Sequence, residues 1–128
     1  MIVDSSAILA VFFQEADAPW FAARIAGAAS KRMSAASYLE CGIRLDRHAG
    51  VPVPDLDLYL EAAAIEIVAV TPAQARIARL AYQRFGKGNH PAGLNFGDCF
   101  AYALAWETGE PLLYKGGDFA RTDVTPVP

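Results

Sequence analysis

Three carboxylates lie at positions from which they could act together. Asp4 directly follows a short apolar segment, Glu40 lies within an expected helix, and Asp98 lies in the first turn of another. An acid that follows a buried strand points out at the strand's carboxyl end, the edge where open α/β sheets bind ligands. If Glu40 and Asp98 converge there with Asp4, they form the hard oxygen ligand set that Mg²⁺ and Mn²⁺ prefer. The spacing therefore favours a divalent metal site.

Each acid also has a purely structural interpretation. Asp98 lies near the positive end of a helix dipole, where an anion is favoured, so ordinary capping explains it. Glu40 lies among apolar residues and either faces solvent or lies beside a cation. Asp4 is the strongest clue, because a carboxylate after Ile2-Val3 should be partly buried, but capping of the next helix, which Ser5 could supply as well, also explains it. Both interpretations stay open at this point.

The elements that must position these acids alternate between strands and helices, which specifies an α/β fold with a parallel sheet covered on both faces. Ser5 or Ser6 is expected to cap the first helix, and Asn95 the last. We expect strands at 2–3, 31–33, 65–70 and 111–114, and a last edge strand at 124–127. We expect helices at 7–12, 17–28, 35–49 (closed by Gly50), 55–64, from Thr71-Pro72 onward, and at 96–108, with a break at 51–54 and a glycine-rich loop at 86–93.

Composition limits the function classes. The chain has 128 residues, a size typical of one domain, and a net charge of −3 with a pI near 5.2. This acidity argues against a protein that coats nucleic acid by bulk electrostatics, although metal ions bound among acids reverse the local charge. Basic residues are available near Asp98, although each is explained as well by a solvated helix face. They are Arg76, Arg79, Arg84, Lys87, His90, Lys115 and Arg121.

Targeting and redox signals are sparse. No stretch approaches the roughly 20 apolar residues of a membrane span, and no basic region precedes the apolar start, so we expect no membrane association and a cytoplasmic location. Cys41 and Cys99 lack metal-binding spacing and lie in helical patterns, so we expect reduced, apolar core residues.

Four parts of the chain together resemble a known family. They are the start MIVDSSA at 1–7, Glu40, the segment LNFGDCFAYALA at 94–105, and LLYKGGDF at 112–119. They look like a PIN domain, and most like the VapC-like toxin ribonucleases of type II bacterial toxin–antitoxin modules. The resemblance covers essentially all of 1–128, and implies a single PIN domain with a three-layer α/β/α arrangement around a mostly parallel, twisted sheet of four or five strands.

The resemblance implies a metal-dependent endoribonuclease in which Asp4, Glu40 and Asp98 hold Mg²⁺ or Mn²⁺. A metal in this setting polarises phosphoryl oxygens and lowers the pKa of its bound water, so no side-chain nucleophile is needed. The family suggests that Ser6 orients a carboxylate or a metal-bound water, although helix capping explains it equally well. We expect Asn95 mainly to order its loop, with phosphate contact as the alternative.

The chain departs from the family after the strand at 112–114. Related proteins commonly carry an acid one or two residues before the final Asp-Phe, where this chain has Gly116 and Gly117. Either Asp118 supplies the fourth carboxylate through the flexible Gly-Gly turn, or the site works with three acids, or activity is impaired.

The resemblance also implies partners. Toxins of this kind are usually homodimers, act on RNA, and are neutralised by a cognate VapB-like antitoxin whose C-terminal segment enters the active-site groove, often with an Arg among the acids. Phe12, Phe13, Trp20 and Phe21 either belong to the core or line a groove for such an antitoxin.

Two other classes compete with the nuclease. One is a catalytically silent, PIN-like interaction module, which the Gly116-Gly117 departure favours. The other is a phosphate-transferring α/β domain, which lacks support because no second acid follows Asp4 at two residues. Gly86-Lys87-Gly88 is too short for a nucleotide-binding loop and follows a helix.

Overall fold

The computed structural model describes residues 1–48 and 55–128. The third expected helix, at 35–49, was predicted too long, because it ends at Asp46 with Arg47 as its C-cap. The expected stop at Gly50 and the expected break at 51–54 lie outside the described residues.

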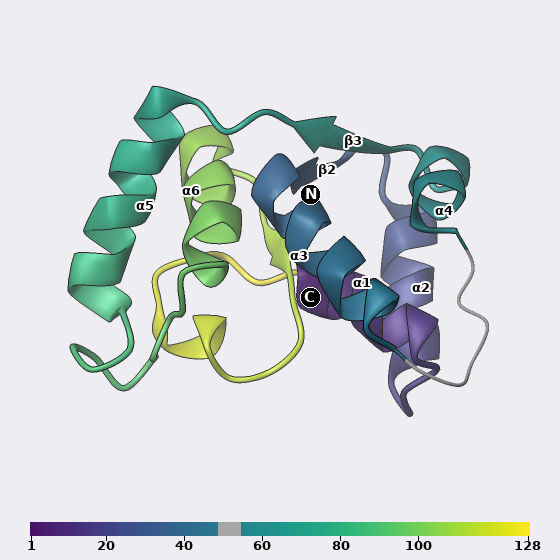
Figure 1. The fold of residues 1–128 in the computed structure, drawn as a ribbon, viewed down its shortest axis with the longest axis horizontal. Coiled ribbons are helices and arrows are strands. Elements are labelled where there is room, and N and C mark those ends of the chain that lie inside the picture. The colour runs from purple at the N-terminus through teal and green to yellow at the C-terminus, as the bar shows by residue number, and fades with distance from the viewer. Residues whose placement is uncertain (49–54) are drawn as a thin grey trace.

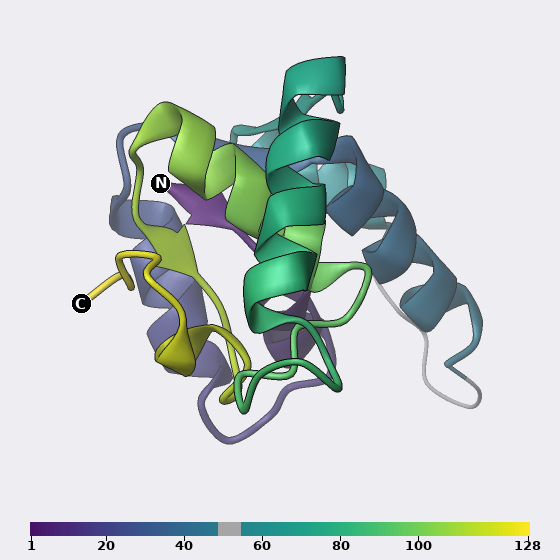
Figure 2. The same ribbon diagram turned by 90° about the vertical axis from the view of Figure 1, so that its left-hand side faces the viewer.

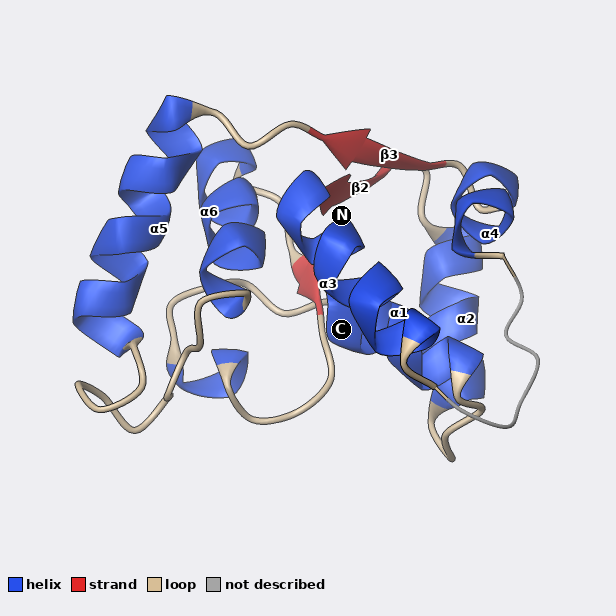
Figure 3. Cartoon of the chain, viewed as in Figure 1, coloured by secondary structure: helices blue, strands red, loops and turns tan. Residues whose placement is uncertain are grey.

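Four parallel strands form the sheet at the centre of the fold (Figure 3). They are β1 (Ile2–Val3), β2 (Lys31–Ser34), β3 (Ile65–Val68) and β4 (Leu112–Leu113), in the order β3-β2-β1-β4. β1 therefore lies between β2 and β4, with Ile2 opposite both Arg32 and Leu112. The expected α/β fold with a mostly parallel sheet is confirmed.

Helices cover both faces of this sheet (Figures 1 and 2). Because strand residues alternate in direction, Ile2 and Leu112 pack with one group of helices, whereas Val3 and Leu113 pack with the other. The first group is α5 (Pro72–Phe85) and α6 (Asp98–Thr108); the second is α1 (Ser5–Phe12), α2 (Ala18–Gly27), α3 (Ala35–Asp46) and α4 (Leu56–Ala62). The three-layer α/β/α arrangement is thus present.

The ends of two helices bear on the site. The prediction that Ser5 or Ser6 caps α1 was wrong, because the carboxylate of Asp4 takes that role and accepts the amide proton of Ser6. The prediction for Asn95 is right in part: its side chain accepts the amide proton of Asp98, the first residue of α6, but the helix begins at Asp98 and not at Phe96, and its N-cap residue is Gly97. At its other end α6 stops at Gly109, whose φ of 67° suits glycine.

The expected edge strand at 124–127 is wrong as a continuous strand. Pro126 forms an isolated parallel bridge with Leu112. The amide of Leu112 donates to the carbonyl oxygen of Thr125 at 2.8 Å, and that of Val127 donates to the carbonyl oxygen of Leu112 at 3.0 Å. Prolines on both sides of Val127 remove the amide donors that a longer ladder needs, so the segment protects the edge of β4 without extending the sheet.

The remaining expectations concern the core. Cys41 and Cys99 are buried free thiols, as expected, and burial raises their pKa values to about 12 and about 11. Phe21 is buried, and Phe12 and Phe13 pack against the core as partly buried residues, whereas Trp20 remains exposed beside Arg24.

Within residues 1–48 and 55–128, we find no helix that combines the length and the apolar character needed to cross a membrane.

Candidate active site

The carboxyl ends of β1 and β4 lie next to each other, and each leads to an acid. Asp4 directly follows β1, and Asp118 lies five residues after β4. The chain moves from β1 to β2 and β3 in one direction, and then returns to place β4 on the other side of β1. Ligands of open α/β sheets bind at such a reversal of strand order, so this edge is the expected location of a site.

Asp4 is buried and held by its neighbours. Its Oδ2 accepts hydrogen bonds from the Ser6 amide at 3.0 Å and from Ser6 Oγ at 2.5 Å. Ser6 Oγ in turn accepts the Lys115 amide proton at 2.9 Å, which joins the end of β1 to the end of β4. Burial raises the pKa of Asp4, the hydrogen bonds of Ser6 oppose this, and the charge of Asp118 adds to it.

Asp98 is held at the start of α6 by a reciprocal pair of hydrogen bonds. The Asp98 amide donates to Asn95 Oδ1, and the Asn95 amide donates to Asp98 Oδ2, both at 2.9 Å. Burial raises the pKa of Asp98 to about 7 against the effect of the Asn95 hydrogen bond, and the charges of Asp4, Asp118 and Glu40 raise it further. Asn95 therefore orders the loop that presents Asp98, as its sequence position indicated.

Glu40 reaches the same edge from α3. Its Oε1 accepts a hydrogen bond from Ser5 Oγ at 3.2 Å, and its Oε2 lies so close to Gly97 that an added Cβ there would overlap it. Its pKa is raised by burial and by the charge of Asp4, against the lowering effects of Ser5 and Arg44. Glu40 is thus next to both the first turn of α1 and the turn before α6.

Ser5 and Gly97 have roles at this edge that sequence reasoning missed. Ser5 was considered only as a helix cap, but its hydroxyl holds Glu40. The signal for Gly97 was a glycine directly before an acid at a helix start, where a side chain is normally tolerated and glycine indicates close approach of another group.

Asp118 occupies an exposed position between the Gly116-Gly117 turn and the short helix η1 (Phe119–Arg121). Gly116 has a φ of 101°, which suits glycine. The charge of Asp118 raises the pKa values of Asp4 and Asp98, so all four carboxylates interact electrostatically.

The carboxylate oxygens at this edge are suitable ligands for a divalent cation, although their present positions do not surround one. As the side chains stand, no three His, Cys, Asp or Glu residues within 1–48 and 55–128 converge closely enough to hold one metal ion. Glu40 Oε2 and Asp98 Oδ1 accept no hydrogen bond from the described residues, and both groups belong to a cluster of oxygens whose charges repel one another. A hard cation would relieve this repulsion.

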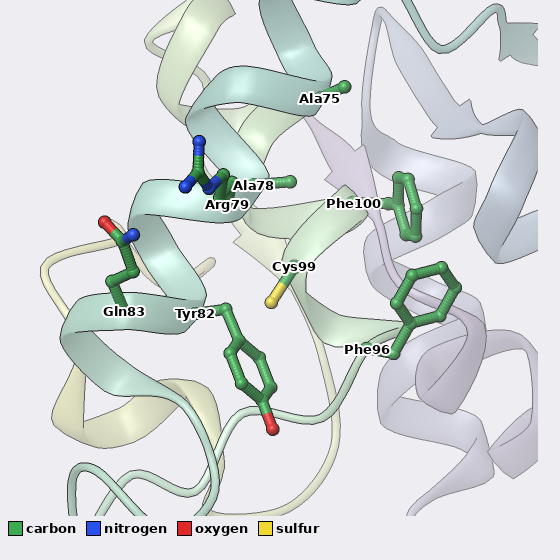
Figure 4. A pocket seen from close by; sticks show the side chains of 8 residues that line it. All are labelled: Ala75, Ala78, Arg79, Tyr82, Gln83, Phe96, Cys99 and Phe100. Atoms are coloured by element: carbon green, nitrogen blue, oxygen red, sulfur yellow. The ribbon is translucent and has the colours of Figure 1, made fainter.

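An apolar groove lies beside the carboxylates. It consists of two hollows, one on each side of the Phe96–Phe100 pair, and we call it the Phe96 groove. Phe96 is 79% exposed, and its ring packs edge-on against Phe100. On one side of this pair, Glu40 and Gly97 line a hollow of about 290 Å³ together with residues of α3. On the other side, α5 and α6 enclose about 460 Å³ (Figure 4). Its lining is Ala75, Ala78, Arg79, Tyr82, Gln83, Phe96, Cys99 and Phe100.

Comparisons with known proteins show the family of the chain. Residues 1–124 match the model of the PIN domain. Ribonuclease VapC28 of Mycobacterium tuberculosis is 53% identical over 126 residues, which cover 97% of this chain and 95% of the relative. Ribonuclease VapC of Mycolicibacterium smegmatis is 48% identical over 128 residues, with 99% of each chain covered.

Solved structures share the fold. Mycobacterium tuberculosis VapC20, described as a sarcin-ricin loop cleaving toxin, superposes with a TM-score of 0.73 at 18% identity, with 98% of this chain and 97% of that chain covered. A toxin–antitoxin complex from Klebsiella pneumoniae gives a TM-score of 0.71 at 16% identity and the same coverage.

Proposed function

The chain belongs to the PIN domain family, in its VapC-like group, and we propose that it is a metal-dependent endoribonuclease that serves as the toxin of a toxin–antitoxin pair. The observation that carries this proposal is the grouping of Asp4, Glu40, Asp98 and Asp118 at one edge of the sheet, where neighbouring negative charges help to raise the pKa values of Asp4, Glu40 and Asp98. The ribonuclease names of relatives at about half identity support the reaction class. We treat residues 1–128 as one PIN domain acting in the cytoplasm, and both statements stay predictions.

In the proposed site, Asp4, Glu40 and Asp98 hold Mg²⁺ or Mn²⁺, and Asp118 supplies a further carboxylate. The ion would polarise a phosphodiester oxygen and lower the pKa of water. The chain positions the ligands: Ser6 holds Asp4, Ser5 holds Glu40, and Asn95 holds Asp98. Because the pKa of Asp98 is about 7, this carboxyl loses its proton near neutral pH before it can act as a ligand.

We propose two protein partners. The first is a VapB-like antitoxin, which the toxin–antitoxin complex among the structural neighbours supports. The second is another copy of this chain, packed against the Phe96 groove and the neighbouring face of α3, where Leu39 is 60% exposed and Ile43 43% exposed. Light scattering tests the dimer: Ile43→Lys should halve the mass in solution, and an unchanged mass would contradict this interface.

A catalytically silent interaction module is the second candidate function. It is favoured because no three acids within the described residues converge closely enough to hold one metal ion, and because Gly116-Gly117 lie where related proteins commonly carry an acid. Cleavage of a mixed RNA pool by the purified protein with Mn²⁺ separates the two. The nuclease should lose cleavage with EDTA and in Asp98→Asn, but keep it in the control Glu66→Gln, which removes an exposed acid from β3. Mn²⁺ binding without RNA cleavage would leave two explanations: a silent interaction module, or a nuclease whose RNA substrate is absent from the pool. Absence of Mn²⁺ binding would overturn the metal-dependent nuclease.

A further inference from the structure

We propose that Lys115 is the positioning residue for Asp118: it fixes the base of the glycine turn that directs this carboxylate toward the other acids. The proposal rests on the proposed function, because it concerns a ligand of the same metal site.

The main chain of Lys115 is tied to Asp4. Its amide donates to Ser6 Oγ at 2.9 Å, and Ser6 Oγ donates to Asp4 Oδ2 at 2.5 Å. The amide of Asp4 in turn donates to the carbonyl oxygen of Leu113 at 2.9 Å, so the β4 chain is held to Asp4 at two points, two residues apart. Lys115 is therefore the last residue of this segment with a fixed place relative to Asp4.

The side chain of Lys115 is tied to the connection between α1 and α2. Its Nζ forms ion pairs with Glu15 and with Asp17, the latter at 2.7 Å. Hydrogen bonds that the ammonium donates to Asp17 and Glu15 raise the pKa of Lys115, so the ammonium stays charged throughout the neutral range. Two carboxylates already surround this one cation, which favours an internal positioning role over a contact with RNA phosphate.

Between Lys115 and Asp118, the carbonyl oxygen of Gly117 accepts the Ala120 amide proton at 3.3 Å, which ties the end of the turn to the segment around Phe119, and the two glycines have no side chains that could pack. A Cβ added at Gly116 or at Gly117 would meet nothing within 4 Å. The next packed side chain is Phe119, which is buried among residues of α6 and β4. The place of Asp118 thus depends on two anchors, Lys115 before the glycines and Phe119 after Asp118. Removal of the ammonium should let the turn drift and carry Asp118 away from Asp4 and Asp98.

Calorimetric titration with Mn²⁺ tests this role without measuring cleavage. Lys115→Met should weaken Mn²⁺ binding by about three- to tenfold, less than the usual loss for groups that orient metal ligands because the ion pairs are partly exposed. Lys115→Arg, which keeps the charge, should stay within about twofold of the parent protein. In an Asp118→Asn background, Lys115→Met should have no further effect on affinity.

That last comparison separates positioning from general stability. The inference would be overturned if Lys115→Met lowered Mn²⁺ affinity equally in the parent and in the Asp118→Asn background, or lowered it in neither. Arg84→Met is the matched control, because it breaks another exposed ion pair, Arg84–Asp123, and should leave Mn²⁺ affinity unchanged. If Lys115→Met fails to fold, the double variant Glu15→Gln/Asp17→Asn removes the same ion pairs and should give the same loss.

Mn²⁺ binding by the parent protein distinguishes failure of the proposed metal site from failure of the proposed role of Lys115. Absence of Mn²⁺ binding in the parent would overturn the proposed metal site, and with it the role of Lys115. Binding in the parent that Lys115→Met leaves unchanged would overturn the role of Lys115 alone. A loss in RNA affinity at constant Mn²⁺ affinity would also overturn it, because Lys115 would then contact the substrate.

Discussion

The two ends of α6 carry acids in opposite electrostatic settings. At its start, Asp98 faces three other carboxylates, and its pKa is raised to about 7. Just past its end, Glu110 forms ion pairs with Arg32 and with the amino group of Met1. Partial burial acts to raise the pKa of Glu110, but the hydrogen bonds and charges of these two cations outweigh it and hold the pKa below its usual value.

The contrast separates an acid that stabilises the fold from one that does not. Glu110 is favoured as an anion by its partners, so its charge contributes to folding. Asp98 is penalised as an anion in the free protein, and so are Asp4 and Glu40. Acids with perturbed pKa values that cluster at one edge of a sheet are typical of functional sites, which supports the proposed metal site. Substitutions at the two ends of α6 should therefore have opposite consequences.

The largest effect is expected for Asp98→Asn. Cleavage should fall by at least about 100-fold, because a metal ligand is lost while the Asn95 cap persists. The free energy of unfolding of the metal-free protein should rise by about 1–3 kcal/mol at pH 8, because the buried charge is removed. Initial cleavage rates and urea unfolding measure the two effects. Full activity in this variant, or in Asp4→Asn, would contradict the metal-site assignment.

Gly97→Ala should come next. Its Cβ would overlap Glu40 Oε2, so the carboxylate must move away, while the fold survives because only the end of a flexible side chain is displaced. We expect Mn²⁺ affinity and cleavage to fall by about ten- to thirtyfold. Calorimetry and cleavage assays would show this.

Gly42→Ala is the matched control, because it lies in the same helix as Glu40 and its added Cβ would make only an ordinary contact at 4.0 Å. Its Mn²⁺ affinity should be that of the parent, with a stability gain of up to about 1 kcal/mol. If Gly97→Ala bound Mn²⁺ as well as Gly42→Ala, Glu40 would not be a ligand.

The pH dependence should also be specific to this end of α6. The folded-state pKa of Asp98, about 7, lies above its ordinary value of 3.8, so the folded protein binds this proton more tightly than the unfolded chain does. The stability of the metal-free protein should therefore decline as pH rises from about 4 through 7. Mn²⁺ competes with the proton, so its affinity should rise roughly tenfold between pH 6 and pH 8. Titrations across this range test both trends, and both should flatten in Asp98→Asn.

The smallest effect is expected at the other end. Glu110→Gln should lower the free energy of unfolding by about 1 kcal/mol, because two cations lose their partner at a partly exposed site. Cleavage at saturating Mn²⁺ should stay within about twofold of the parent. A loss of cleavage comparable to that of Asp98→Asn, measured on folded protein, would remove the contrast between the two ends.

The sequence was sufficient where the deciding contacts are local. The strand before Asp4, the Asn95 cap and the parallel sheet follow from apolar patterning and from groups a few residues apart. The assignment of the α1 cap failed because Asp4, Ser5 and Ser6 are all good capping residues, and only the structure shows which side chain the Ser6 amide meets.

The parts of the site that the sequence did not reveal depend on contacts between segments far apart in the chain. Ser5 meets Glu40 across 35 residues, and Lys115 meets Asp17 across 98. Gly97 matters because of Glu40, whose direction depends on how α3 packs beside α6. No periodicity or propensity encodes such pairs, so the acids themselves were predictable from the sequence, but the groups that hold Glu40 and the glycine turn were not.

The central place of β1 has a consequence for synthesis. This strand is synthesised before the other three, yet one of its two neighbours, β4, lies about 110 residues later, with Ile2 paired to Leu112. Until that segment emerges, β1 has a partner on one side only, and Asp4 lacks the Ser6–Lys115 connection as well as Asp118. For a nuclease of the proposed kind, the cutting edge is therefore assembled only after β4 and Asp118 have been synthesised. We expect a nascent chain that lacks β4 to have no cleavage activity, because the carboxylates have not yet been brought together.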